Sequence, residues 1–104
     1  MTDLDGVLAD HAAWAAGRGG KRANLTGADM SGVILTGADL RWVDLSWVNL
    51  TGANLTGAIL YKVDLTGANL TGADLTRVIL YKADLTGANL TGVDLTGAIL
   101  CEAN

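Results

Sequence analysis

Few side chains in this 104-residue chain have the types and spacing that catalysis requires. There is one histidine, His11, and one cysteine, Cys101, and no serine lies in a nucleophile motif. Aspartates and asparagines recur in steps of five from Asn24 to Asp94, whereas acid–base catalysis needs two carboxyl groups in contrasting environments. The Gly-rich phosphate loop and the Gly-rich calcium nonapeptide are also absent. We therefore expect no enzyme activity, no catalytic residues, no cofactor and no metal.

The acidic positions belong to a repeated sequence motif of five residues (the phrase). From residue 23 to residue 102 the chain reads small apolar, Asp/Asn/Ile, Leu, usually Thr, usually Gly, sixteen times without an insertion. Successive leucines would spiral around an α-helix, and in a straight strand they would alternate between faces. Neither an α-helix nor a straight strand therefore places all the leucines on one face. The pattern works when the chain turns a corner in every pentad and every Leu points to one enclosed axis.

The corner of each pentad is usually formed by the dipeptide Thr–Gly. These residues fit the central positions of a type II turn, whose second position has positive φ and favours glycine. One set of corners has no glycine, because Trp42, Lys62, Lys82 and Glu102 stand in its place. For these corners we expect a different turn.

Departures from the phrase give the size of one coil. Isoleucine replaces Asp or Asn at Ile59, Ile79 and Ile99, and Tyr–Lys replaces Thr–Gly at residues 61–62 and 81–82. Both recur at 20 residues, so four pentads close one coil. The sequence predicts an all-β solenoid of about four coils, roughly 19 Å long at about 4.8 Å per coil.

The first 22 residues do not follow the phrase. Leu4, Val7, Leu8, His11 and Trp14 form one stripe of a helix expected over residues 3–16, where a packed or rim histidine is expected instead of a base. Thr2 and Asp5 resemble a capping box, and Gly17 is a natural stop. We interpret residues 1–22 as a capping helix with a basic, Gly-rich joint, and residues 23–104 as the repeat domain, since terminal coils need covering.

The sixteen pentads of the form A(D/N)LxG resemble the pentapeptide-repeat family over about four-fifths of the chain. The resemblance implies a right-handed quadrilateral β-helix. His11, Trp14, Gly20, Arg22 and Ala23 look like the N-terminal cap of many bacterial members. Some members protect DNA gyrase by presenting an acidic, DNA-like rod, and those are similar to this chain only in the repeat.

Stacking by twenty sorts the outward residues into columns. The carboxylate columns carry a net charge of −4 in the repeat, whereas duplex DNA has about one charge per 1.7 Å, or roughly 11 over this shaft. This density is too low for a DNA mimic. The fourth column is apolar, and contiguous apolar surface marks contact sites. The candidate interaction surface comprises Trp42, Trp47, Ile59, Tyr61, Ile79, Tyr81, Ile99 and Cys101.

A second candidate contact lies at the last coil. No helix follows Glu102, so that coil is expected to expose strand edges, which are usually covered or paired. Two copies meeting there through a two-fold axis would cover both edges. The candidate end-to-end contact comprises Leu85, Leu90, Leu95 and Leu100. We favour this end for self-association and the Ile/Tyr face for a foreign partner.

Composition limits the setting. No apolar run is long enough to cross a membrane, no secretory signal begins the chain, and the single cysteine fits a reducing compartment, so a cytoplasmic protein is expected. The net charge of −4 argues against nucleic acid as a ligand. The expected partner is another protein or a second copy. The leading hypothesis is a non-enzymatic scaffold for protein–protein interaction or self-association; the alternatives are a gyrase-directed DNA mimic and an engineered or consensus-like repeat scaffold.

Overall fold

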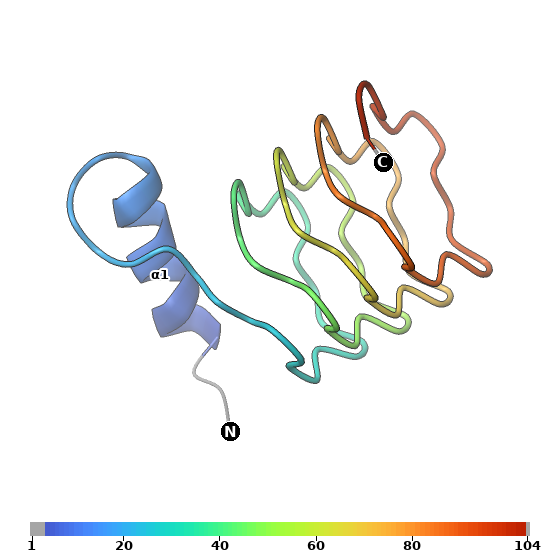
Figure 1. Cartoon of the computed structure of the whole chain (residues 1–104), viewed down its shortest axis with the longest axis horizontal. Coiled ribbons are helices and arrows are strands. Elements are labelled where there is room, and N and C mark those ends of the chain that lie inside the picture. The colour runs from blue at the N-terminus through green and yellow to red at the C-terminus, as the bar shows by residue number, and fades with distance from the viewer. Residues whose placement is uncertain (1–3, 104) are drawn as a thin grey trace.

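The computed structural model describes residues 4–103, with side chains from residue 6 onward. It contains one helix, α1 (Leu4–Ala15), followed by a coiled shaft. Figure 1 places α1 beyond one end of the shaft and the C-terminal coil at the other. In the part of the chain that is described, no helix is both long and apolar enough to span a bilayer.

Parallel β-bridges join residues that are twenty positions apart. Each coil is tied to the next by three kinds of bond: Leu40 N–H donates to the Ile59 carbonyl at 2.9 Å, Trp42 N–H donates to the Tyr61 carbonyl at 3.0 Å, and Ile59 N–H donates to the Ala38 carbonyl at 2.9 Å. A corner follows every five residues, so the described residues carry isolated bridges and no continuous strand. The bridges run in four columns, for example Asp39–Ile59–Ile79–Ile99.

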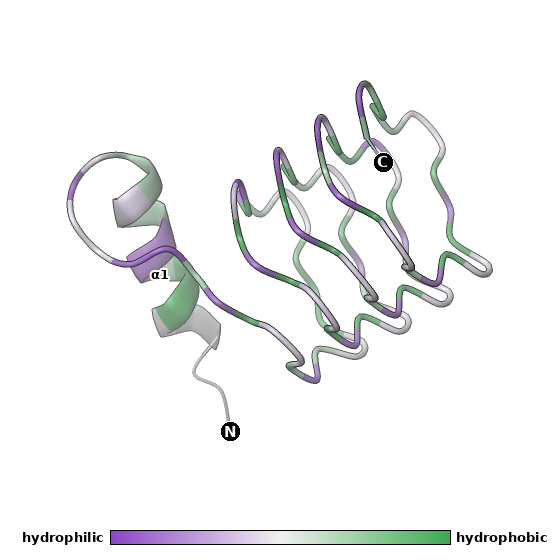
Figure 2. Ribbon diagram, viewed as in Figure 1, coloured by the Kyte–Doolittle hydropathy of each residue, from purple (hydrophilic) through white to green (hydrophobic). Residues whose placement is uncertain are grey.

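The core is a stack of leucines with alanine or valine beside them. Every central leucine from Leu40 to Leu80 is at most 1% exposed, as are Val43, Ala58 and Ala68. Figure 2 shows apolar and polar segments alternating around each coil in the same order. Burial declines in the last coil, where Leu85 to Leu95 are half-buried and Leu100 is 44% exposed. The shaft therefore encloses its core along its middle and opens at its last described coil.

Every corner uses the same turn. The residue after each leucine has negative φ, the next has positive φ, and the small residue that follows donates its N–H to the leucine carbonyl. This is the type II arrangement. The expectation of a different turn where glycine is missing was wrong: Trp42, Lys62, Lys82 and Glu102 have φ of 54–63°. Bridges to the neighbouring coils hold these residues in a conformation that costs an L-residue about 1–2 kcal/mol.

α1 ends in a Schellman motif. Gly17 has φ of 74°, its N–H donates to the Trp14 carbonyl, and Arg18 N–H donates to the Ala13 carbonyl. Only glycine enters this conformation freely, so the helix stops where the sequence predicts. The proposed cap at Thr2 lies outside the described residues. Val7 and Leu8 pack against the repeat core.

Candidate interaction surface

A row of aromatic rings runs from α1 along the shaft. Trp14 meets Trp42 edge-on at 5.7 Å between ring centroids, and Trp42 meets Tyr61 edge-on at 5.8 Å. Tyr61 and Tyr81 are stacked at 5.4 Å with an interplanar angle of 4°. The row therefore combines Trp14 of α1, Trp42 at the positive-φ position of its corner, and the two tyrosines at the corner position that is Thr or Ser on the other faces.

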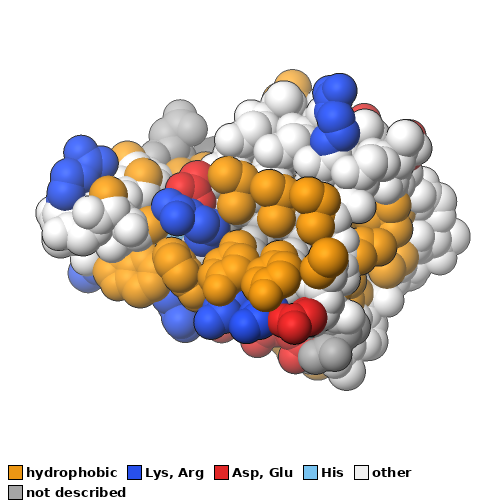
Figure 3. Space-filling view, turned by 90° about the horizontal axis from the view of Figure 1, so that it is seen from above, with side chains coloured by type: hydrophobic (Ala, Val, Ile, Leu, Met, Phe, Trp, Pro, Cys, Tyr) orange, Lys and Arg blue, Asp and Glu red, His pale blue; other side chains and the backbone are white. Residues whose placement is uncertain are grey.

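A row of isoleucines lies beside the rings. Ile59, Ile79 and Ile99 are bridged in one column, and Ile99 is 47% exposed. Figure 3 shows apolar side chains in two rows on this face of the shaft, bordered by basic ones. We call this surface the apolar ladder and define it as Trp42, Ile59, Tyr61, Ile79, Tyr81 and Ile99. Its rings and the first two isoleucines are half-buried and Ile99 is exposed, so each side chain has one side packed and another free to contact a partner.

Cations cover the outer edge of the ring row. The Arg41 guanidinium, Lys62 Nζ and Lys82 Nζ each lie 5.4 Å from the centroid of a ring at their own corner. Arg41 also pairs with Asp39 at 2.8 Å, and Lys82 pairs with Glu102 at 3.7 Å. Among the described residues, Lys62 makes no ion pair. The border of the ladder is therefore basic on a chain that is acidic overall.

Two predicted surface residues lie apart from the rings. Trp47 is 67% exposed on the next corner, and its indole covers Gly67, where an added Cβ would come within 2.5 Å of the ring. Cys101 continues the Tyr81 position into the last coil and is exposed. The structure thus brings Trp42 together with the tyrosines and isoleucines, and places Trp47 beyond the column of Asp44, Asp64 and Asp84.

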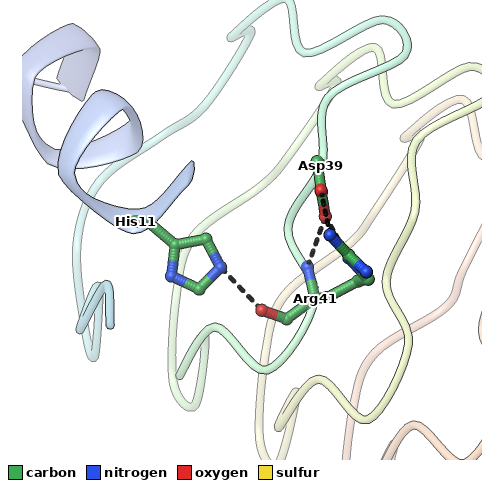
Figure 4. A network of polar contacts seen from close by, with 3 residues as sticks. All are labelled: His11, Asp39 and Arg41. Carbon is green, nitrogen blue, oxygen red and sulfur yellow. Dashed lines mark hydrogen bonds and ion pairs between the residues drawn. The ribbon is translucent and has the colours of Figure 1, made fainter. Parts of the chain in front are cut away.

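His11 joins α1 to the first coil, as Figure 4 shows. The ring is fully buried; Nε2 contacts the Arg41 carbonyl at 2.6 Å, and Ala23 N–H donates to Nδ1 at 2.9 Å. Because Nδ1 accepts from Ala23, Nε2 is the nitrogen that donates to the Arg41 carbonyl. The expectation of a packed histidine is confirmed. Its two backbone partners do not follow from the residue spacing.

The two backbone groups bonded to His11 are those that would pair with a preceding coil if the shaft were longer at this end. In later coils the carbonyl at the Arg41 position accepts the corner N–H of the preceding coil, as in Lys62 N–H to Tyr81 O at 3.0 Å. The N–H at the Ala23 position donates to the carbonyl three residues back, as in Val43 N–H to Leu40 O. His11 takes both places, which satisfies backbone groups at the exposed edge of the first coil.

The Asp and Asn columns are engaged within their own corners. Every Asp and Asn of the repeat from Asn24 to Asp94 accepts, through its Oδ1, the backbone N–H of the residue two positions on, for example Asn54 with Thr56 at 3.0 Å. Where that residue is Thr or Ser its hydroxyl usually donates to the same oxygen, as Thr56 does. The spacing Asp/Asn–Leu–Thr/Ser is the sequence signal for this motif, and the columns stabilise the turns.

These bonds favour the ionised carboxylates. The Ser46 hydroxyl and then its backbone N–H lower the pKa of Asp44, and the Thr76, Thr86 and Thr96 hydroxyls, followed by their N–H groups, lower the pKa values of Asp74, Asp84 and Asp94. For Asp29 the backbone N–H of Ser31 is the larger cause of the lowered pKa. The Arg41 side chain lowers the pKa of Asp39.

The predicted end-to-end contact lies on the last coil. Leu85, Leu90 and Leu95 are half-buried and Leu100 is exposed. In the described residues, the N–H groups of Leu90 and Leu95 make no backbone bond to a further coil, whereas those of Leu70 and Leu75 do. This edge could pair with added chain of the same kind or with a second copy.

The arrangement of the described side chains is suited to binding. Within residues 4–103 no three His, Cys, Asp or Glu side chains gather where they could hold a metal. An open cleft of about 250 Å³ between α1 and residues 21–24 is lined by Val7, Asp10, Lys21, Arg22, Ala23 and Asn24. Its polar side chains do not include an activated nucleophile.

Known proteins of one family match this chain. The model of the pentapeptide repeats, in eight copies, matches residues 21–52, 38–77 and 79–104. A pentapeptide repeat protein (Rfr23) from the cyanobacterium Cyanothece 51142 is 41% identical, with a TM-score of 0.73, and the match covers 79% of this chain and 54% of that one. Another, alr5209 from Nostoc Pcc 7120, is 40% identical with a TM-score of 0.71, over 84% of this chain and 73% of the other. No curated protein matches the sequence.

The match extends over the whole shaft, although this chain spans only about half the length (54%) of the Cyanothece protein. This chain belongs to the pentapeptide-repeat family, whose members form right-handed β-helices.

Proposed function

We propose that this chain is a non-enzymatic scaffold that binds another protein through the apolar ladder. In this proposal residues 23–104 form four coils, and residues 1–22 cap the first of them. The observation that carries the proposal is the ladder itself. On the other columns nearly every outward position is Asp or Asn bonded within its turn, whereas here rings and isoleucines stand in uninterrupted rows.

The ladder has a structural role as well. Stacked cross-strand aromatics contribute about 0.5–1.5 kcal/mol beyond their buried area, so part of the repetition of these rings along the shaft serves the fold. Stacking alone does not require isoleucine beside it or leave Ile99 47% exposed. Contiguous exposed apolar surface of this kind is typical of contact sites.

The test compares the two tyrosines of the ladder with one tryptophan outside it. Tyr61→Ser/Tyr81→Ser removes two rings of the ladder, and Trp47→Ser removes a ring on another corner. Full-length proteins, with folding checked by circular dichroism, are used to capture proteins from an extract of the source cells. We expect at least one protein bound by the parent and by Trp47→Ser and lost from the tyrosine variant. Equal capture by all three would refute the proposal.

Self-association through the last coil is a separate proposal. It is supported by the unpaired N–H groups of Leu90 and Leu95 and by the exposure of Leu100. Light scattering over a range of concentrations tests it. Leu95→Lys should dissociate a dimer that Ile79→Lys/Tyr81→Lys leaves intact; the reverse result assigns the dimer to the ladder, and a parent that stays monomeric removes this proposal.

The aspartate columns weigh against the gyrase alternative. Their Oδ1 atoms are used inside the turns, and the net charge of −4 is spread over the chain. We expect no effect on DNA gyrase in a supercoiling assay at micromolar protein. Inhibition or protection at that concentration would favour the DNA-mimic reading.

A further inference from the structure

We propose that the partner segment bound by the apolar ladder is an amphipathic helix with acidic residues beside its apolar stripe. This inference rests on the proposed function, because it assigns the occupant of the same surface. Four properties of the ladder lead to it: its size, its available backbone groups, its spacing and its charge.

The ladder is too small for a globular partner. Three or four rungs at about 4.8 Å give a length of about 15–20 Å. Two rows two residues apart, with their side chains, are about 15 Å wide, so the surface is on the order of 300 Å². A stable interface between globular proteins takes about 800 Å² from each partner. A single helix, about 10–12 Å across, fits this width.

Strand addition is excluded on this face. The backbone groups under the ladder are used between coils: Leu60 N–H donates to the Ile79 carbonyl at 2.7 Å, and Ile79 N–H donates to the Ala58 carbonyl at 3.0 Å. An extended peptide that docks by β-augmentation needs a free strand edge. The ladder therefore offers a partner side chains only.

The spacing between the stacked rings is close to the pitch of a helix. Tyr61 and Tyr81 are 5.4 Å apart between centroids, and one helical turn advances about 5.4 Å. Apolar residues at i, i+3 or i+4, and i+7 would meet successive rungs. An extended segment brings a side chain to the same face about every 6.7 Å and loses register within two or three rungs.

α1 gives an example of such a contact within the chain. Its Trp14 adds a ring to the N-terminal end of the row, edge-on to Trp42. That end is also closed by the Asp39–Arg41 ion pair. The rungs left for a partner are therefore those of Tyr61, Tyr81 and the isoleucine row.

Charge selects an acidic helix. The ladder and its border hold three cations (Arg41, Lys62, Lys82) and two acids (Asp39, Glu102), a net of +1; the remainder of residues 23–104 holds six Asp and Arg77, a net of −5. An acidic helix is attracted to the ladder and repelled from the aspartate columns of the shaft. A basic helix would be drawn to the aspartate columns instead, so the distribution of charge provides both attraction and exclusion.

The experiment uses a displayed library of 18-residue amphipathic helices as the probe. Each has a fixed leucine stripe and flanking positions that carry Glu, Gln or Lys with equal frequency. The full chain is the bait. We expect enrichment of Glu at the flanks, and the best synthetic peptide should bind at least tenfold more weakly to Tyr61→Ser/Tyr81→Ser and to Lys62→Glu/Lys82→Glu. Trp47→Ser should bind like the parent.

The outcomes separate the inference from the proposed function. Binding that depends on the tyrosines but shows no Glu enrichment overturns the acidic helix and leaves the ladder as the contact surface. An enriched peptide whose binding is unaffected by the tyrosine and lysine variants overturns both. No enriched peptide, with tyrosine-dependent capture of a cellular protein, overturns the helix and keeps the proposed function.

Discussion

At the scale of single residues, the repeat phrase is a set of local instructions for one corner. The Asp or Asn side chain accepts the N–H two residues on, and the residue with positive φ lets the chain turn. Glycine is preferred there because a side chain adds strain, yet six other residues hold the same φ. The neighbouring coils therefore enforce the turn where the local sequence does not favour it.

Substitutions at two glycines allow the cost of backbone strain to be measured apart from the cost of a side-chain clash. Gly72 has φ of 68° and open space around an added Cβ, so Gly72→Ala should cost about 1 kcal/mol through strain alone. Gly67 has φ of 67° but lies under the Trp47 ring. Gly67→Ala should cost about 0.5–1 kcal/mol more, because the indole must move.

Denaturant unfolding of both variants measures these costs. The extra cost at Gly67 should disappear when Trp47→Ala is the background, as a double-mutant cycle would show. If Gly67→Ala and Gly72→Ala were equally destabilising with Trp47 present, the indole would not rest on this corner in solution.

The aspartate turns make stability depend on pH. Hydrogen bonds lower the folded-state pKa values of Asp29, Asp39, Asp44, Asp74, Asp84 and Asp94 from the ordinary value of 3.8. A carboxyl group with a lowered folded pKa contributes stability above its unfolded pKa and loses it as the pH falls through the folded value. The melting temperature should be level from pH 7 to about 5 and fall below about pH 4.

Asparagine provides the matched variant. Asn54, Asn69 and Asn89 accept the same bond without a charge. The triple variant Asp74→Asn/Asp84→Asn/Asp94→Asn should melt like the parent at pH 7 and lose roughly half as much on acidification, because three of the six carboxylates are gone. An unchanged acid profile would show that other groups control acid unfolding.

At the scale of elements, α1 is held by contacts that its own sequence only partly reveals. The apolar stripe and the stop at Gly17 follow from spacing and from the freedom of glycine. The pairing of His11 with Ala23 and Arg41 does not, because it depends on where the edge of the first coil lies. Gly20 shows the same limit: its φ is 76°, and an added Cβ would come within 2.2 Å of the Asp10 carbonyl oxygen.

Removing the His11 ring should loosen α1. His11→Ala leaves the Arg41 carbonyl and the Ala23 N–H without partners, at a cost of about 1–3 kcal/mol. Amide hydrogen exchange in α1 should accelerate by about 10- to 100-fold, while exchange in the middle coils stays unchanged. Ala12→Gln, on the exposed side of the helix, is the control. Equal exchange in both variants would contradict the anchoring role of His11.

At the scale of the whole molecule, the five- and twenty-residue periods predict which residues face the core and which share a column. The buried leucines and the bridged isoleucines follow that prediction. Spacing alone did not predict that Trp14 extends the ring row or that Trp47 turns onto Gly67. Those placements depend on side-chain rotamers and on the docking of α1, which a one-dimensional repeat does not encode.

Insertions of different length test whether the five-residue period sets the buried core and the twenty-residue period sets the surface columns. Duplicating residues 63–67 keeps every corner and every inward leucine but moves all later residues by one face. Tyr81 would then stack on Thr66 in place of Tyr61, and Ile79 on Asp64. Because the turn bonds are local, stability should fall by only about 0.5–1.5 kcal/mol, the value of the lost ring stack. The near-ultraviolet circular dichroism of the stacked tyrosines should disappear.

Two further insertions, one of a whole coil and one of a single residue, give the stabilities between which the five-residue insertion should fall. Duplicating residues 63–82 adds a whole coil, so the ring signal should persist and stability should rise, as in other repeat proteins whose stability grows with each stacked unit. Duplicating Gly67 alone shifts every later leucine by one place in the phrase and should cost several kcal/mol by turning polar residues toward the axis. If the one-residue and five-residue insertions melted alike, the corners would not set the register of the coil. If the five-residue insertion kept the tyrosine signal, the columns would not be fixed by the twenty-residue period.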